Sequence, residues 1–517
     1  MRFLPPDLVA TLTDLADATL TGSGAPGLGL SVFTPSEVVL ERGFGLRDRE
    51  ARLPVTPDTI FGVASVTKSF TALTALALEE RGLLSIGDDV RSYFDFGRLW
   101  SEGEAPRVEH FLSHTSGLPP TPTMTWLRYA SQEDDPVAAG PTLDEAKLTL
   151  VPGVMGMAPV PTGSLTLSGL EAAAAALEDG EARRRLEALA ALVSDFAGLA
   201  GWMGENAAPL APPGGLYSYS NDAFCLAGGI VARAAGAPFA AAVDREVLLP
   251  LGMRRSRFDL GGVLADADHS TLYTKDAAGT VRRSPAWQTT GVMQGGGMLK
   301  STLADLRVYV RHLMRGGPKV RAMTAPRVSS APGAAYGLGL AINEDHHGLR
   351  VVKHGGSLKG GSSAIGFVPE LGVGVVVLCN LDGVPAEQLL TRAINACAGL
   401  PLDAAAYEPE PFLAAAAPEA ATSGPDGGEA TPSAAAEPFL GEYLSGEPYG
   451  RLRLYRTASG ELRAQEGWPK VDLPAFVAGP DEVALVYPER RAPVRLLRDE
   501  HDEVWGAQAG RVMRRLG

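Results

Sequence analysis

Cysteine is scarce in this 517-residue chain, and no disulfide framework is expected. The three cysteines, Cys225, Cys379 and Cys397, are odd in number and widely spaced, unlike the even sets that hold small secreted domains together. Cys225 and Cys379 lie in apolar runs, where a buried thiol packs like a small hydrophobic side chain. The hydrophobic content of 45% is ordinary for a globular protein, and the length predicts two to three domains.

A long apolar run and a surplus of basic residues are also missing. No stretch of 18 or more apolar residues occurs, and Pro5, Pro6 and Asp7 interrupt the segment where the apolar part of a signal peptide would lie. We therefore expect no membrane span and a cytoplasmic location. The formal charge of −14 argues against nucleic acid or anionic membranes as partners, because both bind basic surfaces.

Two hydrolase signatures are absent from the sequence. No Gly-x-Ser-x-Gly elbow occurs, which disfavours an α/β-hydrolase. The eight histidines form neither a His-Glu-x-x-His motif nor a paired Cys/His spacing, which disfavours a zinc hydrolase. We therefore expect a protein without a metal or an organic cofactor.

What the chain does contain is a serine followed three positions later by a lysine, Ser65 and Lys68, before the apolar run 71–78. Residues at this spacing lie on one face of a helix, so the amine of Lys68 can reach the hydroxyl of Ser65. The pair is chemically useful only in a desolvated pocket, because a lysine accepts a proton near neutral pH only when its ammonium is disfavoured. A surface helix could carry both residues by accident. However, only eight of the 46 basic residues are lysines, and Lys68 alone has a serine three positions before it.

A second polar cluster, Tyr219-Ser220-Asn221, is the only Tyr-x-Asn in the chain. It precedes an apolar stretch at 223–231 that is expected to be helical. Taken alone, the cluster is best interpreted as a helix N-cap provided by Ser220 or Asn221.

A third motif, His354-Gly355-Gly356, ends an expected strand. Two glycines beside a histidine let a ligand approach the backbone closely. The alternative interpretation is a turn with an incidental histidine.

The pattern of the chain predicts an α+β fold. An N-terminal hairpin is expected from strands at 26–33 and 37–43, and a helix is expected from Ser65 to about Glu80. A tight glycine-rich turn at 294–301 leads into a helix at 302–314. Further strands are expected as an antiparallel meander, at 336–342, 350–354, 363–368 and 373–378.

Composition divides the chain into a main domain at 1–402, a flexible acidic Ala/Pro-rich linker at 403–437 and a small all-β domain at 438–517. Within the main domain, 121–213 is expected to be a mostly helical insertion. Two roles for this insertion stay open: added stability, or control of substrate access.

Four segments in order carry a family resemblance: 59–68, 112–119, 219–221 and 354–356. Together they resemble the serine β-lactamase and penicillin-recognising family, and within it the class C branch with its esterases and D-aminopeptidases. The resemblance covers about residues 10–400, apart from much of the insertion. It implies an antiparallel sheet flanked by helices next to an all-helical region. Appended lipocalin-like barrels in some peptidase members imply such a barrel for 438–517.

The resemblance also implies catalytic roles. Ser65 is expected to be the nucleophile, and Lys68 and Tyr219 are expected to share the proton transfers, with the identity of the base left open. Asn221 is expected to orient Lys68 and contact the substrate. The backbone N–H groups of Ser65 and Ser357 are expected to form the oxyanion hole.

The third motif departs from the β-lactamase pattern, in which Lys-Thr-Gly stands where this chain has His354-Gly355-Gly356. A histidine provides at most a fraction of a positive charge near pH 7, and Lys353 is expected on the opposite face of the strand. The expected function is therefore a serine hydrolase that forms an acyl-enzyme with an ester, an amide or a short D-amino-acid peptide. A true β-lactamase, a non-catalytic sensor or scaffold with this fold, and a cell-wall transpeptidase are the alternatives. A homo-oligomer is left open.

Overall fold

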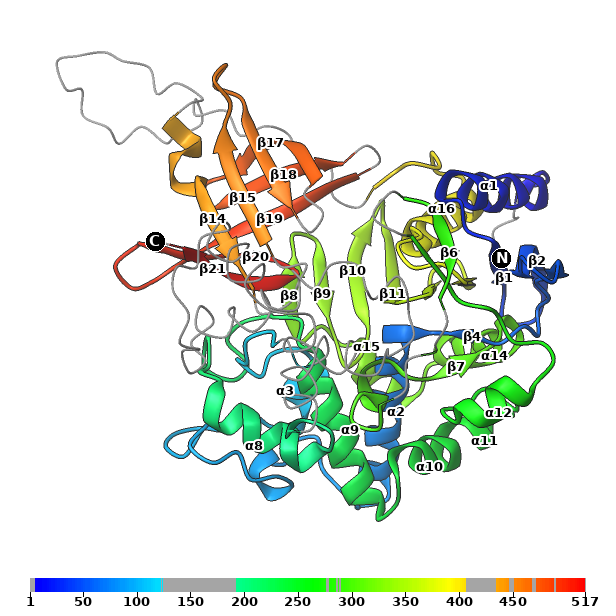
Figure 1. Cartoon of the computed structure of the whole chain (residues 1–517), viewed down its shortest axis with the longest axis horizontal. Helices are drawn as coiled ribbons and strands as arrows, with labels where there is room; N and C mark the ends of the chain where they lie inside the picture. Colours follow the sequence, from blue (N-terminus) through cyan, green and yellow to red (C-terminus); the bar gives the residue numbers. More distant parts are fainter. Residues whose placement is uncertain are drawn as a thin grey trace, which may run out of the picture.

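A computed structural model describes residues 5–121, 123, 192–275, 279–284, 287, 290–405, 434–445, 451–466, 471–487 and 490–516. These residues form an antiparallel sheet with helices on both faces, a helical region and a C-terminal β-barrel (Figure 1). The expected α+β class is confirmed.

The central sheet has nine strands in the order β3-β2-β1-β13-β12-β11-β10-β9-β8, and each strand runs antiparallel to its neighbours. Its strands are β1 (Gly27–Phe33), β2 (Val38–Asp48), β3 (Leu53–Pro54), β8 (Val328–Ala331), β9 (Ala334–Tyr336), β10 (Ala341–His346), β11 (Leu349–Leu358), β12 (Gly361–Val368) and β13 (Val373–Cys379). The predicted N-terminal hairpin and meander are both present. Pairing of β1 with β13 joins these two parts of the sequence into one sheet.

The prediction of one continuous strand at 336–342 was wrong, because this segment runs from the end of β9 to the start of β10. Gly339 lies in the break with a φ of +69°, a left-handed conformation that favours glycine. A Cβ atom at Gly339 would lie 2.6 Å from the backbone oxygen of Lys68. The break therefore lets the chain approach the helix that carries Lys68.

Two helices cover one face of the sheet: α1 (Leu8–Ser23) and α16 (Ala386–Ala398), whose buried side chains share a core with alternate residues of β1 and β13. On the other face, Leu303 of α14 (Leu303–Arg315) packs directly against Gly29 of β1. Thr302 caps α14 by accepting a hydrogen bond from the N–H of Asp305. The predicted helix at 302–314 is confirmed.

The helical region is centred on α2 (Thr67–Glu80) and α9 (Asn221–Ala235), which are buried along most of their length. The other described helices are α3 (Val108–Leu112), α8 (Phe196–Asn206), α10 (Phe239–Val243), α11 (Leu249–Leu251), α12 (Leu260–Ala265), α13 (Gln294–Gly297) and α15 (Pro318–Thr324). Short strand pairs join β4 (Phe61–Gly62) to β7 (Lys300–Ser301) and β5 (Tyr273–Lys275) to β6 (Val281–Arg283).

Two expectations around this region need correction. Ser65 is not inside the helix, because it lies in a 3₁₀ turn (Ala64–Val66) that runs directly into α2. The segment 294–301 is not a simple tight turn, since it forms helix α13 followed by strand β7. In both places the backbone is shaped by packing against distant segments, which local turn residues do not reveal.

All three cysteines are buried and free. Burial raises the pKa of the Cys397 thiol to about 12 and that of the other two thiols further. Thiolates are the reactive form of cysteine, so these side chains are core residues, as expected for Cys225 and Cys379.

The C-terminal strands close into an eight-stranded antiparallel barrel, which confirms the expected all-β domain (Figure 1, orange to red). They are β14 (Gly441–Leu444), β15 (Arg451–Arg456), β16 (Leu462–Glu466), β17 (Val471–Gly479), β18 (Glu482–Tyr487), β19 (Arg490–Arg498), β20 (Val504–Ala509) and β21 (Arg511–Leu516). Most of the expected linker at 403–437 lies outside the described residues, and the predicted domain boundaries stay predictions.

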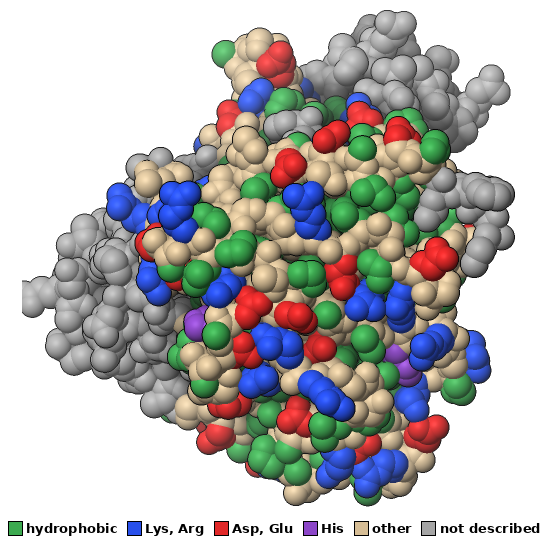
Figure 2. Space-filling model, turned by 90° about the vertical axis from the view of Figure 1, so that its right-hand side faces the viewer, with side chains coloured by type: hydrophobic (Ala, Val, Ile, Leu, Met, Phe, Trp, Pro, Cys, Tyr) green, Lys and Arg blue, Asp and Glu red, His purple; other side chains and the backbone are tan. Residues whose placement is uncertain are grey.

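Most of the expected insertion at 121–213 also lies outside the described residues, apart from its last part, which contains α8. In the described part of the chain, no single helix combines the length and apolar composition needed to cross a membrane, although the bent pair Asn221–Ala235 and Phe239–Leu251 meets both measures together. Basic and acidic side chains are interspersed on the face shown in Figure 2.

The contact between α9 and α13 depends on paired glycines and can be tested. A Cβ at Gly295 would lie 2.5 Å from the backbone oxygen of Phe224 and 2.8 Å from the Cα of Gly228. We predict that Gly295→Ala lowers the free energy of unfolding by about 1–3 kcal/mol, as overpacking in a tight core does. Urea unfolding followed by circular dichroism measures this change.

Gly291→Ala is the matched control, because nothing lies within 4 Å of a Cβ at that position. It should change the free energy of unfolding by less than about 0.5 kcal/mol. Equal effects of the two substitutions would contradict the close packing described above.

Candidate active site

The backbone before Ser65 is held in an unusual shape. Ala64 has a φ of +47°, a conformation that L-residues adopt only when the surroundings impose it. Two hydrogen bonds hold the backbone carbonyl groups at this point. Thr67 Oγ1 donates to Ala64 O at 2.7 Å, and Ser363 Oγ donates to Val63 O at 2.7 Å. Ser65 is therefore presented by a constrained turn at the start of α2.

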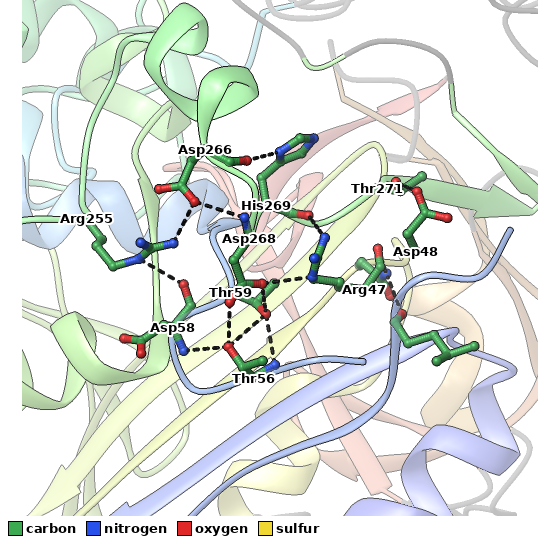
Figure 3. A network of polar contacts seen from close by, with 12 residues as sticks. Arg47, Asp48, Thr56, Asp58, Thr59, Arg255, Asp266, Asp268, His269 and Thr271 are labelled. Carbon is green, nitrogen blue, oxygen red and sulfur yellow. Dashed lines mark hydrogen bonds and ion pairs between the residues drawn. The ribbon is translucent and has the colours of Figure 1, made fainter. Parts of the chain in front are cut away.

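A polar network fixes the segment that leads to this turn (Figure 3). The carboxylate of Asp268 accepts hydrogen bonds from the hydroxyls of Thr56 and Thr59, both at 2.6 Å, and forms a 2.9 Å ion pair with Arg47. The backbone oxygen of Asp268 also accepts from the N–H of Ile60 at 2.9 Å. These contacts anchor the chain just before β4 and thus help to position Ser65.

Lys68 is fully buried and makes three hydrogen bonds. Its Nζ lies 3.0 Å from Ser65 Oγ, 2.9 Å from Asn221 Oδ1 and 2.7 Å from the backbone oxygen of Gly296. Two of the N–H groups of Lys68 are thus held by Asn221 and Gly296, and the third position on its nitrogen faces Ser65 Oγ. The amine and the hydroxyl that the sequence placed together are in contact.

Tyr219 also lies close to this amine, with its ring centroid 5.0 Å from Lys68 Nζ. The next residue, Ser220, caps α9 by accepting a hydrogen bond from the N–H of Ala223. The capping role and the functional arrangement therefore coexist: the cap sets the start of α9, and Asn221 at that start reaches Lys68.

His114 holds the same segment and was not recognised as a site residue. Its Nδ1 accepts a hydrogen bond from the N–H of Ser220 at 3.0 Å, and its ring lies 4.1 Å from that of Tyr219. Burial, followed by the charge of Lys68, lowers the pKa of His114 well below its usual value. His114 thus stays neutral. Its place in the 112–119 segment was the one available signal.

His354 is also buried and neutral. Its Nδ1 lies 2.6 Å from its neighbour's backbone oxygen, Gly355 O, and its Nε2 lies 2.9 Å from the hydroxyl of Tyr336. Because a carbonyl oxygen can only accept, Nδ1 carries the proton and Nε2 accepts from Tyr336. Burial, with a contribution from the charge of Lys68, lowers the pKa of His354 to about 4. His354 therefore provides no cation at pH 7.

Lys353 lies on the face of β11 opposite to His354, as expected, where it forms a 3.2 Å ion pair with Glu387 of α16. Both Lys353 and Glu387 still line the cavity described below. The same carboxylate lies against Gly355, since a Cβ there would be 1.9 Å from Glu387 Oε1. The glycine thus makes room for an acidic side chain, in addition to exposing backbone to a ligand.

The site residues open into a cavity of about 870 Å³. Its walls include every expected site residue except the fully buried Lys68: Ser65, Tyr219, Asn221, His354, Gly355, Gly356 and Ser357. A cavity of this size accommodates a small molecule or a short peptide.

The barrel also contributes to the cavity, which the sequence did not predict. Gly510 and Arg511, at the β20–β21 turn, line the cavity together with Arg491 of β19. The guanidinium carbon of Arg511 lies 5.1 Å from the ring centroid of Tyr219. The cavity is thus shared between the main domain and the barrel.

Within the described ranges, no group of three or more His, Cys, Asp or Glu side chains is arranged to hold a metal ion. The chemistry available at the described site is that of a serine hydroxyl, a buried amine, a phenol and an amide.

Comparison with known proteins assigns the chain to a family. The Beta-lactamase family model matches residues 12–398. The chain belongs to the beta-lactamase family. The resemblance noted from the sequence is thereby confirmed, over nearly the range expected.

Esterase EstB from Burkholderia gladioli is 31% identical over 264 residues, which are 50% of this chain and 53% of EstB. The chain thus aligns with about half the length of this curated relative.

Two solved structures share the beta-lactamase-family fold. The octameric penicillin-binding protein homologue from Pyrococcus abyssi is 23% identical with a TM-score of 0.57, covering 98% of this chain and 100% of that one. A class C beta lactamase from Rhodobacter sphaeroides is 18% identical with a TM-score of 0.52, covering 75% of this chain and 98% of that one.

The neutral state of His354 predicts acid sensitivity. The pKa of His354 in the folded chain, about 4, is below the ordinary value of 6.5, so the unfolded chain binds the proton more tightly. Its contribution to stability is complete above pH 6.5 and is lost as the pH falls toward 4. We expect this one group to lower the free energy of unfolding by about 2–3 kcal/mol over that range.

Urea unfolding at pH 7.0 and pH 4.5 measures the difference, and His354→Gln is the reference because glutamine does not titrate. The wild-type chain should lose more stability than the variant between the two pH values. Parallel losses would show that His354 is not buried as a neutral ring.

Proposed function

We propose that this protein is a serine hydrolase that forms an acyl-enzyme on Ser65. The observation that carries the proposal is the set of three contacts made by Lys68, which hold a buried amine 3.0 Å from the Ser65 hydroxyl. A buried lysine with no chemical task is costly. Here its contacts aim it at one hydroxyl at the wall of a cavity.

In this proposal, Lys68 and Tyr219 remove the proton of Ser65 as its oxygen attacks the carbonyl carbon of the substrate. Asn221 keeps Lys68 in line with Ser65. Tyr219 then gives a proton to the departing alcohol or amine, since Tyr219 lines the cavity whereas Lys68 is fully buried and does not. Water attacks the acyl-enzyme with the same groups acting in reverse.

The backbone N–H groups of Ser65 and Ser357 are proposed to stabilise the negative oxygen of the tetrahedral intermediate. Both residues line the cavity, and Ser357 lies on β11 beside the glycines of the third motif. One such donor contributes about 10²–10³ in rate.

An ester or a D-amino-acid peptide is the proposed substrate class. EstB, at 31% identity, is an esterase by name, and neutral His354 leaves β11 without a free cation for the carboxylate of a β-lactam. A true β-lactamase is the second candidate, because Arg511 brings a positive charge to the cavity from the barrel. A homo-oligomer stays a prediction, with an octameric homologue among the solved structures.

The role of Ser65 is tested by covalent labelling. We predict that a fluorophosphonate probe labels the wild-type protein and that Ser65→Ala abolishes both labelling and hydrolysis of 4-nitrophenyl esters. Intact-protein mass spectrometry and initial rates measure the two outcomes.

Ser357→Ala is the matched control, because it keeps the backbone N–H and removes only an exposed hydroxyl from the same cavity. It should retain labelling. Labelling that persists in Ser65→Ala would disprove the proposal.

The role of Tyr219 is tested by Tyr219→Phe, which removes the hydroxyl and keeps the ring beside Lys68. We predict that kcat/KM falls by about 10²–10⁴, the range that general acid–base groups contribute. A loss smaller than tenfold would assign both proton transfers to Lys68 alone. Near-normal unfolding by circular dichroism is the required control.

A further inference from the structure

The β20–β21 hairpin of the barrel is built into the catalytic region. Its turn residue, Gly510, has a φ of +73°, which favours glycine. Three hydrogen bonds tie the hairpin to the segment that ends in Tyr219. They are Tyr219 N–H to Gly510 O at 3.2 Å, Gln508 Nε2 to Tyr217 O at 2.7 Å, and Val512 N–H to Ser218 Oγ at 3.4 Å. The hairpin therefore has a defined position relative to the reacting groups.

Arg511 follows the turn and extends over the face of Tyr219, with its guanidinium carbon 5.1 Å from the ring centroid. It also lines the cavity that contains Ser65. A guanidinium stays charged at any physiological pH and presents a planar fork of donors that suits a carboxylate. Arg511 thus brings a permanent cation beside the phenol proposed to protonate the leaving group.

The charged side chains on the cavity wall favour an anionic ligand. His354 is neutral, and Lys353 is paired with Glu387 at 3.2 Å. Among the described wall residues, Lys353, Arg392, Arg491 and Arg511 are cationic, and Glu387 and Asp403 are acidic. The wall therefore carries a surplus of positive charge in a chain whose formal charge is −14. Such a local contrast attracts anionic ligands to the cavity.

We propose that Arg511 binds a carboxylate on the leaving-group side of the scissile bond. The substrates are then esters or amides whose departing alcohol or amine carries a carboxylate, as the C-terminal residue of a peptide does. In this arrangement the barrel provides the cation that neutral His354 does not. The proposal rests on the proposed serine hydrolase function, and it names the substrate class of the same site.

Two esters that differ only in the leaving group test the proposal: 3-(acetyloxy)benzoate, which has a free carboxylate, and its uncharged methyl ester. We predict that wild-type kcat/KM favours the carboxylate. Arg511→Gln should lower kcat/KM for the carboxylate ester by about 10–100-fold, the range of a lost hydrogen bond to a charged group, with less than a threefold change for the methyl ester. Acetyl-D-alanyl-D-alanine and its C-terminal amide extend the test to peptides, and a chromogenic cephalosporin extends it to β-lactams.

Arg453→Gln is the matched control. Arg453 is also a barrel arginine over a tyrosine face, 5.4 Å from the ring centroid of Tyr455, but it is not a wall residue of the cavity. It should leave the preference between the two esters unchanged.

The outcomes separate the two proposals. Equal losses on both esters in Arg511→Gln would overturn carboxylate binding and leave Arg511 as a residue that positions Tyr219. Unchanged kcat/KM values for both esters in this variant would overturn carboxylate binding as well. If wild-type protein hydrolyses neither ester and Ser65 takes no phosphonate label, the serine hydrolase proposal fails and the carboxylate proposal fails with it.

Discussion

The placement of one buried amine is the constraint on which the described site depends. Lys68 needs acceptors for its hydrogens, because an unpaired ammonium or amine inside a protein is expensive. Those acceptors come from three separate elements: the turn at Ser65, the start of α9 at Asn221, and α13 at Gly296. Satisfying Lys68 therefore brings together three parts of the chain.

Much of the surrounding architecture can be understood as support for these acceptors. The glycine contact between Gly228 of α9 and Gly295 of α13 holds these two helices close together. Asn221 begins α9, and Gly296 follows Gly295 in α13. Gly339 allows the chain between β9 and β10 to approach the Lys68 backbone. The Asp268 network anchors the strand that enters the Ser65 turn.

The sequence was informative where the relevant physics is local. The three-residue spacing of Ser65 and Lys68 places both on one helical face, and alternation and turn residues marked the strands of the sheet. The same reasoning failed where contacts are remote. Gly296 meets Lys68 across 228 positions, and no feature of a glycine-rich segment shows which of its carbonyl groups will accept a hydrogen bond. His114 is another case, because its Nδ1 accepts a hydrogen bond from the backbone N–H of Ser220, 106 positions away.

Arg511 shows a different limit of local reasoning. The replacement of a strand lysine by His354 was read from the sequence as the loss of a cation from the pocket, and the low pKa of His354 agrees with that reading of the strand. The structure nevertheless places another cation in the cavity, on a hairpin of a separate domain. A strand motif reports only what the strand itself provides. When a pocket is shared by two domains, its charge must be counted over both, and a charge lost from one wall can be supplied from the other without any trace in the motif.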